Sequence, residues 1–376
     1  MKLIQGISAI LLATLAAGCA TDKEQVNPAK LVKFNETAKL EVSWKQNVGK
    51  MGINVLTPAV TAESVLAANS QGMIYSFEKN TGKQLWRVNS GFAISGAVGA
   101  GENIALVGGV KGEIAAYEVS SGKFLWKSKV SSEVQSAPKI SEGIVVVRTG
   151  DGRIAGLNSQ TGERLWLYER STPALVARSN AGVTIRRGIV YAGFAAGKLA
   201  AISLHNGVII WESSVSQPRG STELERISDI ISLPELNDSQ VCGVAFQGRI
   251  ACFDADQGGS LWTRDIASDK GLTMSRKYLF LTESSGEVLG LDKLSGSSYW
   301  KNDQLHLRQT TAPLAQDRYL AVADYEGYVH TLNRDDGSFI ARMRTDGSAI
   351  NSAPVELNEG FVVQTVNGGI FAMTLR

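Results

Sequence analysis

The sequence is poor in the residue types that most often carry out catalysis or bind metal ions. Its 376 residues include only three histidines, three cysteines and eight prolines. His205, His306 and His330 are far apart, and no GxSxG, HExxH, P-loop or CxxC motif is present. The acidic turns at 254–259 and 333–338 lack the downstream glutamate of a calcium loop. The residues themselves therefore give no support for a catalytic centre, a metal site or a cofactor.

An excess of charge is also missing. The chain has 38 lysines and arginines against 36 aspartates and glutamates, a formal net charge of +2. Balanced charge provides no bulk electrostatic attraction for nucleic acid or for an anionic surface. We therefore expect a mixed polar surface and no nucleic-acid partner.

Long hydrophobic runs are absent beyond the first residues. Residues 1–18 are predicted to be a signal peptide. The positively charged Lys2 stands near their start, and the apolar stretch that follows it is too short to span a membrane comfortably. Their ending, LAAGC, resembles a bacterial lipobox with Ala16 in place of the usual leucine, so Cys19 is the expected lipidation site. The alternative is an ordinary signal peptide that leaves a free thiol. Residues 19–38 are polar and are predicted to be a flexible tether.

A fifteen-residue pattern, GRIAGLNSQTGERLW at 152–166, recurs along the chain with a period near 40. The first glycine of the pattern recurs at Gly72, Gly112, Gly152, Gly197, Gly248, Gly286, Gly327 and Gly368. A second glycine follows at Gly82, Gly122, Gly162, Gly207, Gly258, Gly296 and Gly337. A tryptophan follows at Trp86, Trp126, Trp166, Trp211, Trp262 and Trp300, with Ala341 in the seventh place. A repeat of this length built from strands predicts a propeller or solenoid.

Each copy of the pattern is typical of strands joined by tight turns. The first glycine is expected in a hairpin loop that needs a positive φ. An aliphatic residue follows two places after this glycine, a small residue four places after it and a large apolar residue five places after it, a pattern typical of a β-strand. The small residue would let a neighbouring sheet approach closely. The tryptophan falls on the next strand, after the second glycine turn. With the β-branched run upstream, each unit supplies about four antiparallel strands, which is one blade.

The eighth copy is incomplete and indicates how the ring closes. It begins at Gly368, and the sequence ends at Arg376, before the turn and the tryptophan strand. The N-terminal run 40–48 supplies the missing strand, because its Trp44 has no glycine turn before it. We therefore predict that residues 39–376 form one all-β domain, an eight-bladed propeller of four-stranded antiparallel blades. The strand around Trp44 completes the last blade and removes an exposed sheet edge.

Two neighbouring connections are longer than the others. The spacing between first glycines rises from 40 to 45 and then to 51, and the extra residues fall at about 168–184 and 216–236. Equivalent connections of adjacent blades emerge side by side on one face. The second connection combines charged residues with several aliphatic ones, which favours a protein-binding patch. Drift in loop length is the alternative.

The remaining cysteines, Cys242 and Cys252, flank a predicted hairpin. If residues 246–248 form a three-residue loop, the two cysteines lie directly opposite on one face. An exported protein meets an oxidising compartment, so a cross-strand disulfide is one interpretation. The other is that Cys252 only fills the small position of the repeat, because antiparallel pairs often have unsuitable geometry for a disulfide.

The TG-xxxW repeats over 40–376 resemble those of the quinoprotein-type propellers. Together with the LAAGC ending and the run GSTELERISDI at 220–230, they resemble the BamB family, lipoproteins of the machinery that folds and inserts outer-membrane β-barrels. The resemblance implies a non-enzymatic, monomeric scaffold without a cofactor. It would be anchored through Cys19 at the periplasmic face of the outer membrane, as Ala20 in place of aspartate also implies. It would dock on the POTRA domains of BamA and through BamA join the rest of the complex.

The resemblance also implies which residues dock, and they fall in the two long connections. The family's patch uses two leucines and an arginine in the first connection, of which Leu175 and Arg178 are matched and Ala177 replaces the second leucine. It uses two aspartates in the second, of which Asp229 is matched and Ile231 replaces the other. The predicted partner-binding residues are Leu175, Ala177, Arg178, Glu223, Arg226, Asp229 and Ile231. Arg178 and Asp229 would make charge-assisted contacts, and Leu175 would be a buried anchor.

Three further interpretations remain open. Unfolded outer-membrane proteins are a second predicted partner, which the ring would contact through hydrophobic surfaces or strand edges. A quinone-dependent dehydrogenase could be built on the same repeat, but such enzymes hold their quinone beside an adjacent pair of cysteines, which this sequence lacks. A lipid-anchored periplasmic binding module is the third.

Overall fold

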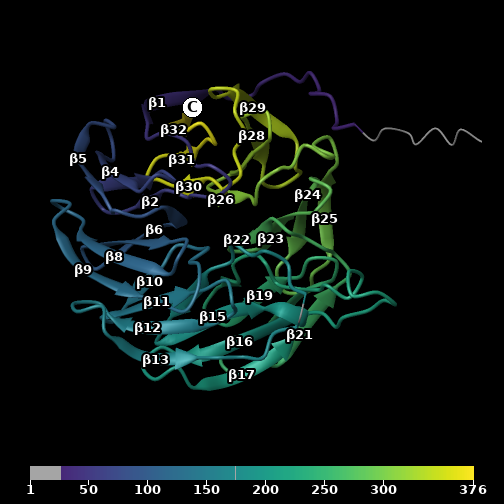
Figure 1. Cartoon of the computed structure of the whole chain (residues 1–376). Coiled ribbons are helices and arrows are strands. Elements are labelled where there is room, and N and C mark those ends of the chain that lie inside the picture. Colours follow the sequence, from purple (N-terminus) through teal and green to yellow (C-terminus); the bar gives the residue numbers. More distant parts are fainter. Residues whose placement is uncertain (1–26, 174) are drawn as a thin grey trace, which may run out of the picture.

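The computed structural model describes residues 27–173 and 175–376, and the predicted signal peptide and Cys19 lie outside these ranges. The described chain forms eight four-stranded antiparallel sheets that follow one another around a ring (Figure 1). The predicted eight-bladed propeller is therefore confirmed. The only helical element in the described ranges is the 3-10 turn η1 (Ala195–Gly197).

Blades one to seven take their four strands in sequence order, and blade eight is built from both ends of the chain. The first strands of the blades are β2 (Ala59–Val60), β6 (Ile94–Gly101), β10 (Lys139–Ser141), β14 (Val183–Arg186), β18 (Glu235–Leu236), β22 (Gly271–Met274), β26 (Leu314–Gln316) and β30 (Val355–Glu356). The second strands are β3 (Ser64–Ala68), β7 (Ile104–Gly109), β11 (Ile144–Arg148), β15 (Ile189–Phe194), β19 (Gln240–Val244), β23 (Tyr278–Thr282), β27 (Tyr319–Ala323) and β31 (Phe361–Gln364). The third strands are β4 (Met73–Glu78), β8 (Glu113–Glu118), β12 (Ile154–Asn158), β16 (Lys198–Ser203), β20 (Ile250–Asp254), β24 (Val288–Asp292), β28 (Tyr328–Asn333) and β32 (Gly369–Leu375). The outermost strands are β5 (Gln84–Asn89), β9 (Phe124–Lys129), β13 (Arg164–Tyr168), β17 (Ile209–Ser214), β21 (Ser260–Arg264), β25 (Ser298–Asn302), β29 (Phe339–Arg344) and β1 (Leu40–Asn47).

Blade eight closes the ring as the incomplete last repeat predicts. Strand β1 pairs antiparallel with β32, from Leu40 opposite Leu375 to Asn47 opposite Gly369. The pairing joins the two ends of the sequence in one sheet, with the purple β1 beside the yellow β32 in Figure 1. It covers the edge that β32 would otherwise expose.

The core is divided among the interfaces between blades. The apolar run of β11 illustrates this, because Ile144 and Val146 pack toward blade four, whereas Val145 and Val147 pack toward blade two. Successive side chains of a strand point to opposite faces of its sheet. The inner strands therefore read as continuous apolar runs, since each blade is covered on both sides.

Each tryptophan of the repeat locks its blade to the next one. The indole Nε1 of Trp126, for example, donates to the carbonyl of Ser159 at 2.7 Å, and its ring fills the space above Gly162 in blade three. A Cβ on Gly162 would lie 2.4 Å from the ring. The seven tryptophan–glycine pairs are Trp44–Gly82, Trp86–Gly122, Trp126–Gly162, Trp166–Gly207, Trp211–Gly258, Trp262–Gly296 and Trp300–Gly337.

The small residue of the repeat lies opposite the tryptophan in the same blade. Gly156 pairs with Trp166, and a Cβ on Gly156 would lie 2.1 Å from that indole ring. Gly290 has the same relation to Trp300. At these two glycines the small residue makes room for the tryptophan of the adjacent strand, whereas the small residues Ala116 and Ala201 lie in apolar clusters shared with the neighbouring blade, as expected.

The seventh repeat has alanine in the tryptophan position because its neighbour lacks the matching turn. A tryptophan at position 341 would face blade eight, where β32 ends and β1 begins with no turn between them. Ala341 is instead buried in a cluster that includes Leu40 and Met373. The seam between blades seven and eight is therefore the one interface of the ring without a tryptophan lock.

The described part of the predicted tether lies on the ring. Residues 27–38 run beside blade seven and lead into β1, as the purple segment near β28 and β29 in Figure 1 shows. The Nη1 atom of Arg308 donates to the carbonyl of Ala29 at 2.9 Å, and the Nη1 atom of Arg342 donates to the carbonyl of Val32 at 2.9 Å. Two arginines of the ring thus hold residues that the composition alone assigned to a flexible linker.

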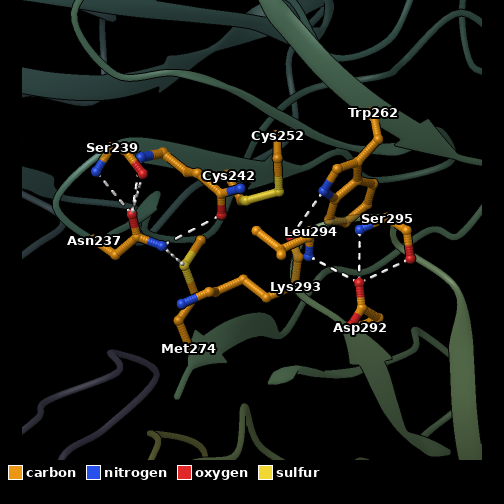
Figure 2. The surroundings of a disulfide bond; sticks show 11 residues. Asn237, Ser239, Cys242, Cys252, Trp262, Met274, Asp292, Lys293, Leu294 and Ser295 are labelled. Atoms are coloured by element: carbon orange, nitrogen blue, oxygen red, sulfur yellow. Dashed lines mark hydrogen bonds between the residues drawn. A yellow bond between two sulfur atoms is a disulfide. The ribbon is translucent and has the colours of Figure 1, made fainter. Parts of the chain in front are cut away.

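The hairpin of blade five contains a disulfide between Cys242 and Cys252 (Figure 2). The two residues are directly paired in the β19–β20 register, and their Cα atoms are 4.1 Å apart. Residues 245–249 join the two strands, and the N–H of Ala245 donates to the carbonyl of Arg249, which leaves residues 246–248 as the three-residue loop that the predicted cross-strand pairing requires. Both cysteines are fully buried between blades five and six.

We expect the double variant Cys242→Ala, Cys252→Ala to unfold at lower urea than the wild type. A link across ten residues restricts the unfolded chain, and its loss costs about 2–3 kcal/mol. Urea unfolding of the full-length protein, with and without reductant, measures the difference. Reductant should weaken the wild type and leave the double variant unchanged. Equal midpoints for wild type and double variant without reductant would show that the cysteines are not linked.

Candidate functional site

The two long connections meet on one face of the ring. They span residues 169–182 after β13 and residues 215–234 after β17, and each leads from an outermost strand to the first strand of the next blade. Residues of both connections line one groove of about 540 Å³, together with the ends of β11 and β15. The structure therefore brings together Ala177, Arg178, Asp229 and Ile231, as the sequence predicts for neighbouring connections.

Asp229 fixes the two connections to each other. Its Oδ2 atom accepts the backbone N–H of Ala177 at 2.8 Å, and its Oδ1 atom accepts the backbone N–H of Ala196 at 2.9 Å. The residue is 4% exposed. Ala196 has a φ of 56°, an uncommon conformation for alanine that a strong acceptor helps to hold. The sequence assigned Asp229 to the partner surface, but in the structure its buried carboxylate ties the second connection to the first connection and to the η1 turn.

The first connection presents the apolar part of the surface. Leu175 is 42% exposed, and the adjacent Val176 is 40% exposed and lines the groove. Arg178 is half exposed and bonds the Oε1 atom of Glu133 at 3.1 Å. Sequence reasoning missed Val176, although it lies between two of the matched positions. Leu175, Val176 and Arg178 together form a small patch in which apolar surface adjoins a charged group.

The tip of the second connection is a separate feature. Glu223 and Arg226 are exposed and pair with each other at 3.7 Å, and Arg226 also donates through Nε to the carbonyl of Gly220. Backbone N–H groups of Ser221 and Thr222 hold the pKa of Glu225 below its usual range. Glu223 and Arg226 are not among the residues that line the groove. Of the predicted set, these two therefore stand apart from the others.

Arg148 is a groove residue that the sequence did not indicate. It ends β11, and its guanidinium lies 5.4 Å from the centre of the Phe194 ring. Burial lowers the pKa of Arg148 to about 10, although the nearby Asp229 carboxylate acts in the opposite direction. The only sequence signal is a charged residue at the end of an apolar strand, which composition and spacing do not distinguish from a surface residue.

No cluster of three or more histidine, cysteine, aspartate or glutamate side chains among the described residues is arranged to hold a metal ion. No helix within residues 27–173 and 175–376 is long and apolar enough to cross a membrane.

Comparisons with known proteins agree on one family. The family profile described as "Outer membrane protein assembly factor BamB" matches residues 70–302. A relative of that name from Pseudomonas aeruginosa is 44% identical, over 98% of this chain and 98% of its own length. The crystal structure of BamB from Moraxella catarrhalis superposes with a TM-score of 0.83 at 25% identity, over 89% of this chain and 99% of that chain.

A second kind of propeller shares the fold at low identity. Quinohemoprotein alcohol dehydrogenase from Comamonas testosteroni superposes with a TM-score of 0.73, at 11% identity, over 89% of this chain and 76% of that enzyme. At such identity the likeness concerns the architecture alone. It accounts for the resemblance of the repeats to those of quinoproteins.

Proposed function

This chain belongs to the family of BamB outer membrane protein assembly factors, and from that premise we propose how it binds within the assembly complex. The family makes it a non-enzymatic scaffold of outer-membrane protein assembly, a component of the BAM complex that is associated with the outer membrane. We propose that it docks on the POTRA domains of BamA through the face that carries the two long connections. We also propose that acyl chains on Cys19 anchor it at the periplasmic side of that membrane.

One observation carries the docking proposal: the two longest connections are fixed to each other and expose an apolar patch beside a charge. Asp229, in the second connection, holds the backbone of the first connection at Ala177 and the η1 turn at Ala196, so the surface is organised before a partner arrives. Leu175 and Val176 offer apolar area, and Arg178 offers a charged donor at the rim. A preorganised apolar anchor with a polar rim is the usual composition of a binding hot spot.

We expect Arg178→Glu and Leu175→Ala each to weaken co-purification with BamA. Arg178→Glu reverses the charge at the rim and adds repulsion with Glu133, whereas Leu175→Ala removes exposed apolar area that binding would bury. Each variant should bring down at most about a tenth of the BamA that the wild type brings down, which corresponds to a loss of about 1.4 kcal/mol in binding free energy. The measurement is a pull-down from detergent-solubilised membranes.

The control for this pull-down is Arg87→Glu, an equal change of charge on the exposed outer strand of blade one. Asp229→Lys is unsuitable as a surface variant, because it would place a lysine where a buried carboxylate holds two backbone groups. Undiminished BamA in both the Arg178→Glu and the Leu175→Ala pull-downs would refute the site. Absence of BamA from the wild-type pull-down would refute the partner. Direct contact with unfolded outer-membrane proteins stays a prediction.

A further inference from the structure

Arg148 is the one guanidinium in the groove with a buried donor that has no acceptor. Its Nη1 atom is inaccessible to solvent and has no hydrogen-bond partner among the described residues. A buried donor without a hydrogen bond costs free energy, because it has lost its contact with water and has gained no acceptor. The chain therefore maintains, in its candidate docking groove, a cation that it does not itself satisfy.

The carboxylates around the groove are already engaged with other groups. Both oxygens of Asp229 accept backbone N–H groups, from Ala177 and Ala196. The carboxylate of Asp151 accepts from Arg153 and Thr149. Glu133, beside the groove, accepts from Arg178 through one oxygen and from Gln135 through the other. Asp229 influences Arg148 only through its field, and none of the three carboxylates makes a hydrogen bond to it.

The surroundings hold Arg148 in place without supplying an acceptor. The Phe194 ring lies under its guanidinium, and Arg170 lies 5.6 Å from the centre of the same ring while pairing with Glu212. A guanidinium fixed over an aromatic face has lost much of its conformational freedom. An acceptor that enters the groove would therefore meet a donor that is already oriented.

We propose that the groove receives an acidic side chain of the docking partner, an aspartate or glutamate whose carboxylate accepts a hydrogen bond from the part of the Arg148 guanidinium that faces the groove. This inference rests on the proposed function, because it specifies the chemistry of the same docking face. The groove of about 540 Å³ has room for one side chain and part of its backbone. Val176 and Ile230 also line the groove, and their apolar side chains would reduce the contact of a bound pair with water, which strengthens a charge-assisted bond.

A single carboxylate fits this groove better than a phosphate group. The basic residues that line the groove are Arg148 and Arg178, and Arg178 already pairs with Glu133. One guanidinium without an ion-pair partner matches the one charge of a carboxylate. A phosphate group carries more charge and more acceptor oxygens than this donor set satisfies.

The first test compares the affinity of Arg148 variants for the periplasmic POTRA fragment of the same organism's BamA. The full-length protein in detergent is measured as wild type, Arg148→Met, Arg148→Lys and the distant control Arg87→Met. We expect Arg148→Met to bind roughly tenfold more weakly or worse, with an unchanged or higher Tm, because it removes a guanidinium whose buried Nη1 atom has no acceptor among the described residues of the free protein. Arg148→Lys should retain part of the affinity, and Arg87→Met all of it.

Two results of this comparison would overturn the inference. One is wild-type affinity in Arg148→Met. The other is weaker binding with a Tm lowered by several degrees, which would assign Arg148 to the fold and not to the partner. Wild-type affinity in Arg148→Met, with weakened binding in Arg178→Glu, would leave the proposed docking face standing.

The second test identifies what enters the groove without assuming the partner. A photo-crosslinking amino acid at position 176 is used in cells with Arg148 and with Arg148→Met, and the crosslinked peptide is sequenced. We expect a crosslink to a segment that contains an aspartate or glutamate, and its loss in Arg148→Met. If that segment belongs to a protein other than BamA, the proposed partner falls and the inference stands. No crosslink, or one that is independent of Arg148, overturns the inference.

Discussion

Asp229→Ala is expected to abolish detectable BamA binding, although the replaced side chain is buried. The change leaves the backbone N–H groups of Ala177 and Ala196 without acceptors and releases the first long connection from the second. Hydrogen bonds to charged groups contribute about 1.5–3 kcal/mol each, so the loss of both should lower stability by about 3–6 kcal/mol. The loss in binding should exceed that of Leu175→Ala, because both connections lose their fixed conformation.

Hydrogen exchange separates this explanation from a direct contact between Asp229 and the partner. In Asp229→Ala the amides of Ala177 and Ala196 should exchange faster in the free protein, before any partner is added. Asp229→Asn is the matched variant, because its amide keeps one acceptor oxygen and should lose about half of the effect. If exchange at both amides were unchanged and binding were still lost, Asp229 would have to contact the partner directly.

Gly162→Ala is expected to destabilise the ring by about 2–4 kcal/mol, a large cost for the addition of one methyl group. The new Cβ would lie 2.4 Å from the Trp126 ring, so the lock between blades two and three could not form in its present position. Gly162 also has a φ of 72°, which a residue with a Cβ adopts at a cost of about 1–2 kcal/mol. Urea unfolding and tryptophan fluorescence of the variant measure both effects.

Gly91→Ala is the matched control for this prediction. Gly91 has a φ of 75°, but nothing lies within 4 Å of the Cβ that would be added. It should therefore show the backbone cost alone, about 1–2 kcal/mol. The difference between the two variants is the cost of displacing Trp126. Equal destabilisation of the two would mean that the indole moves aside freely and that the lock contributes little.

The architecture could be predicted because its determinants are local and repeated. The glycine and tryptophan spacing defines the blades, and the truncated copy at Gly368 with the unmatched Trp44 defines the closure. One local detail differed: Gln247, not Gly248, takes the positive φ in the hairpin of blade five. A three-residue loop can place its left-handed residue at more than one position, and spacing alone does not select it.

The roles within the site could not be read from the sequence because they depend on burial. An aspartate in a charged loop looks like a surface residue, and only the fold shows that both oxygens of Asp229 point into the protein. The role of Arg148 could not be predicted either, because the absence of an acceptor for its Nη1 atom depends on the residues that surround it in the fold. The attachment of residues 27–38 depends on Arg308 and Arg342, which lie near the other end of the sequence.

The pairing of β1 with β32 has a consequence for the order in which the ring folds. Leu40 and Leu375 are neighbours in blade eight although almost the whole chain separates them, and contacts of that range form slowly. Ribosomes make β1 first, so it has no partner strand until the last residues of the chain are complete. The seam between blades seven and eight, which no tryptophan locks, is thus expected to close last and to open first. Residues 27–38 cross this seam from blade seven into β1, so their hydrogen bonds to blade seven should help to hold the seam closed once folding is complete.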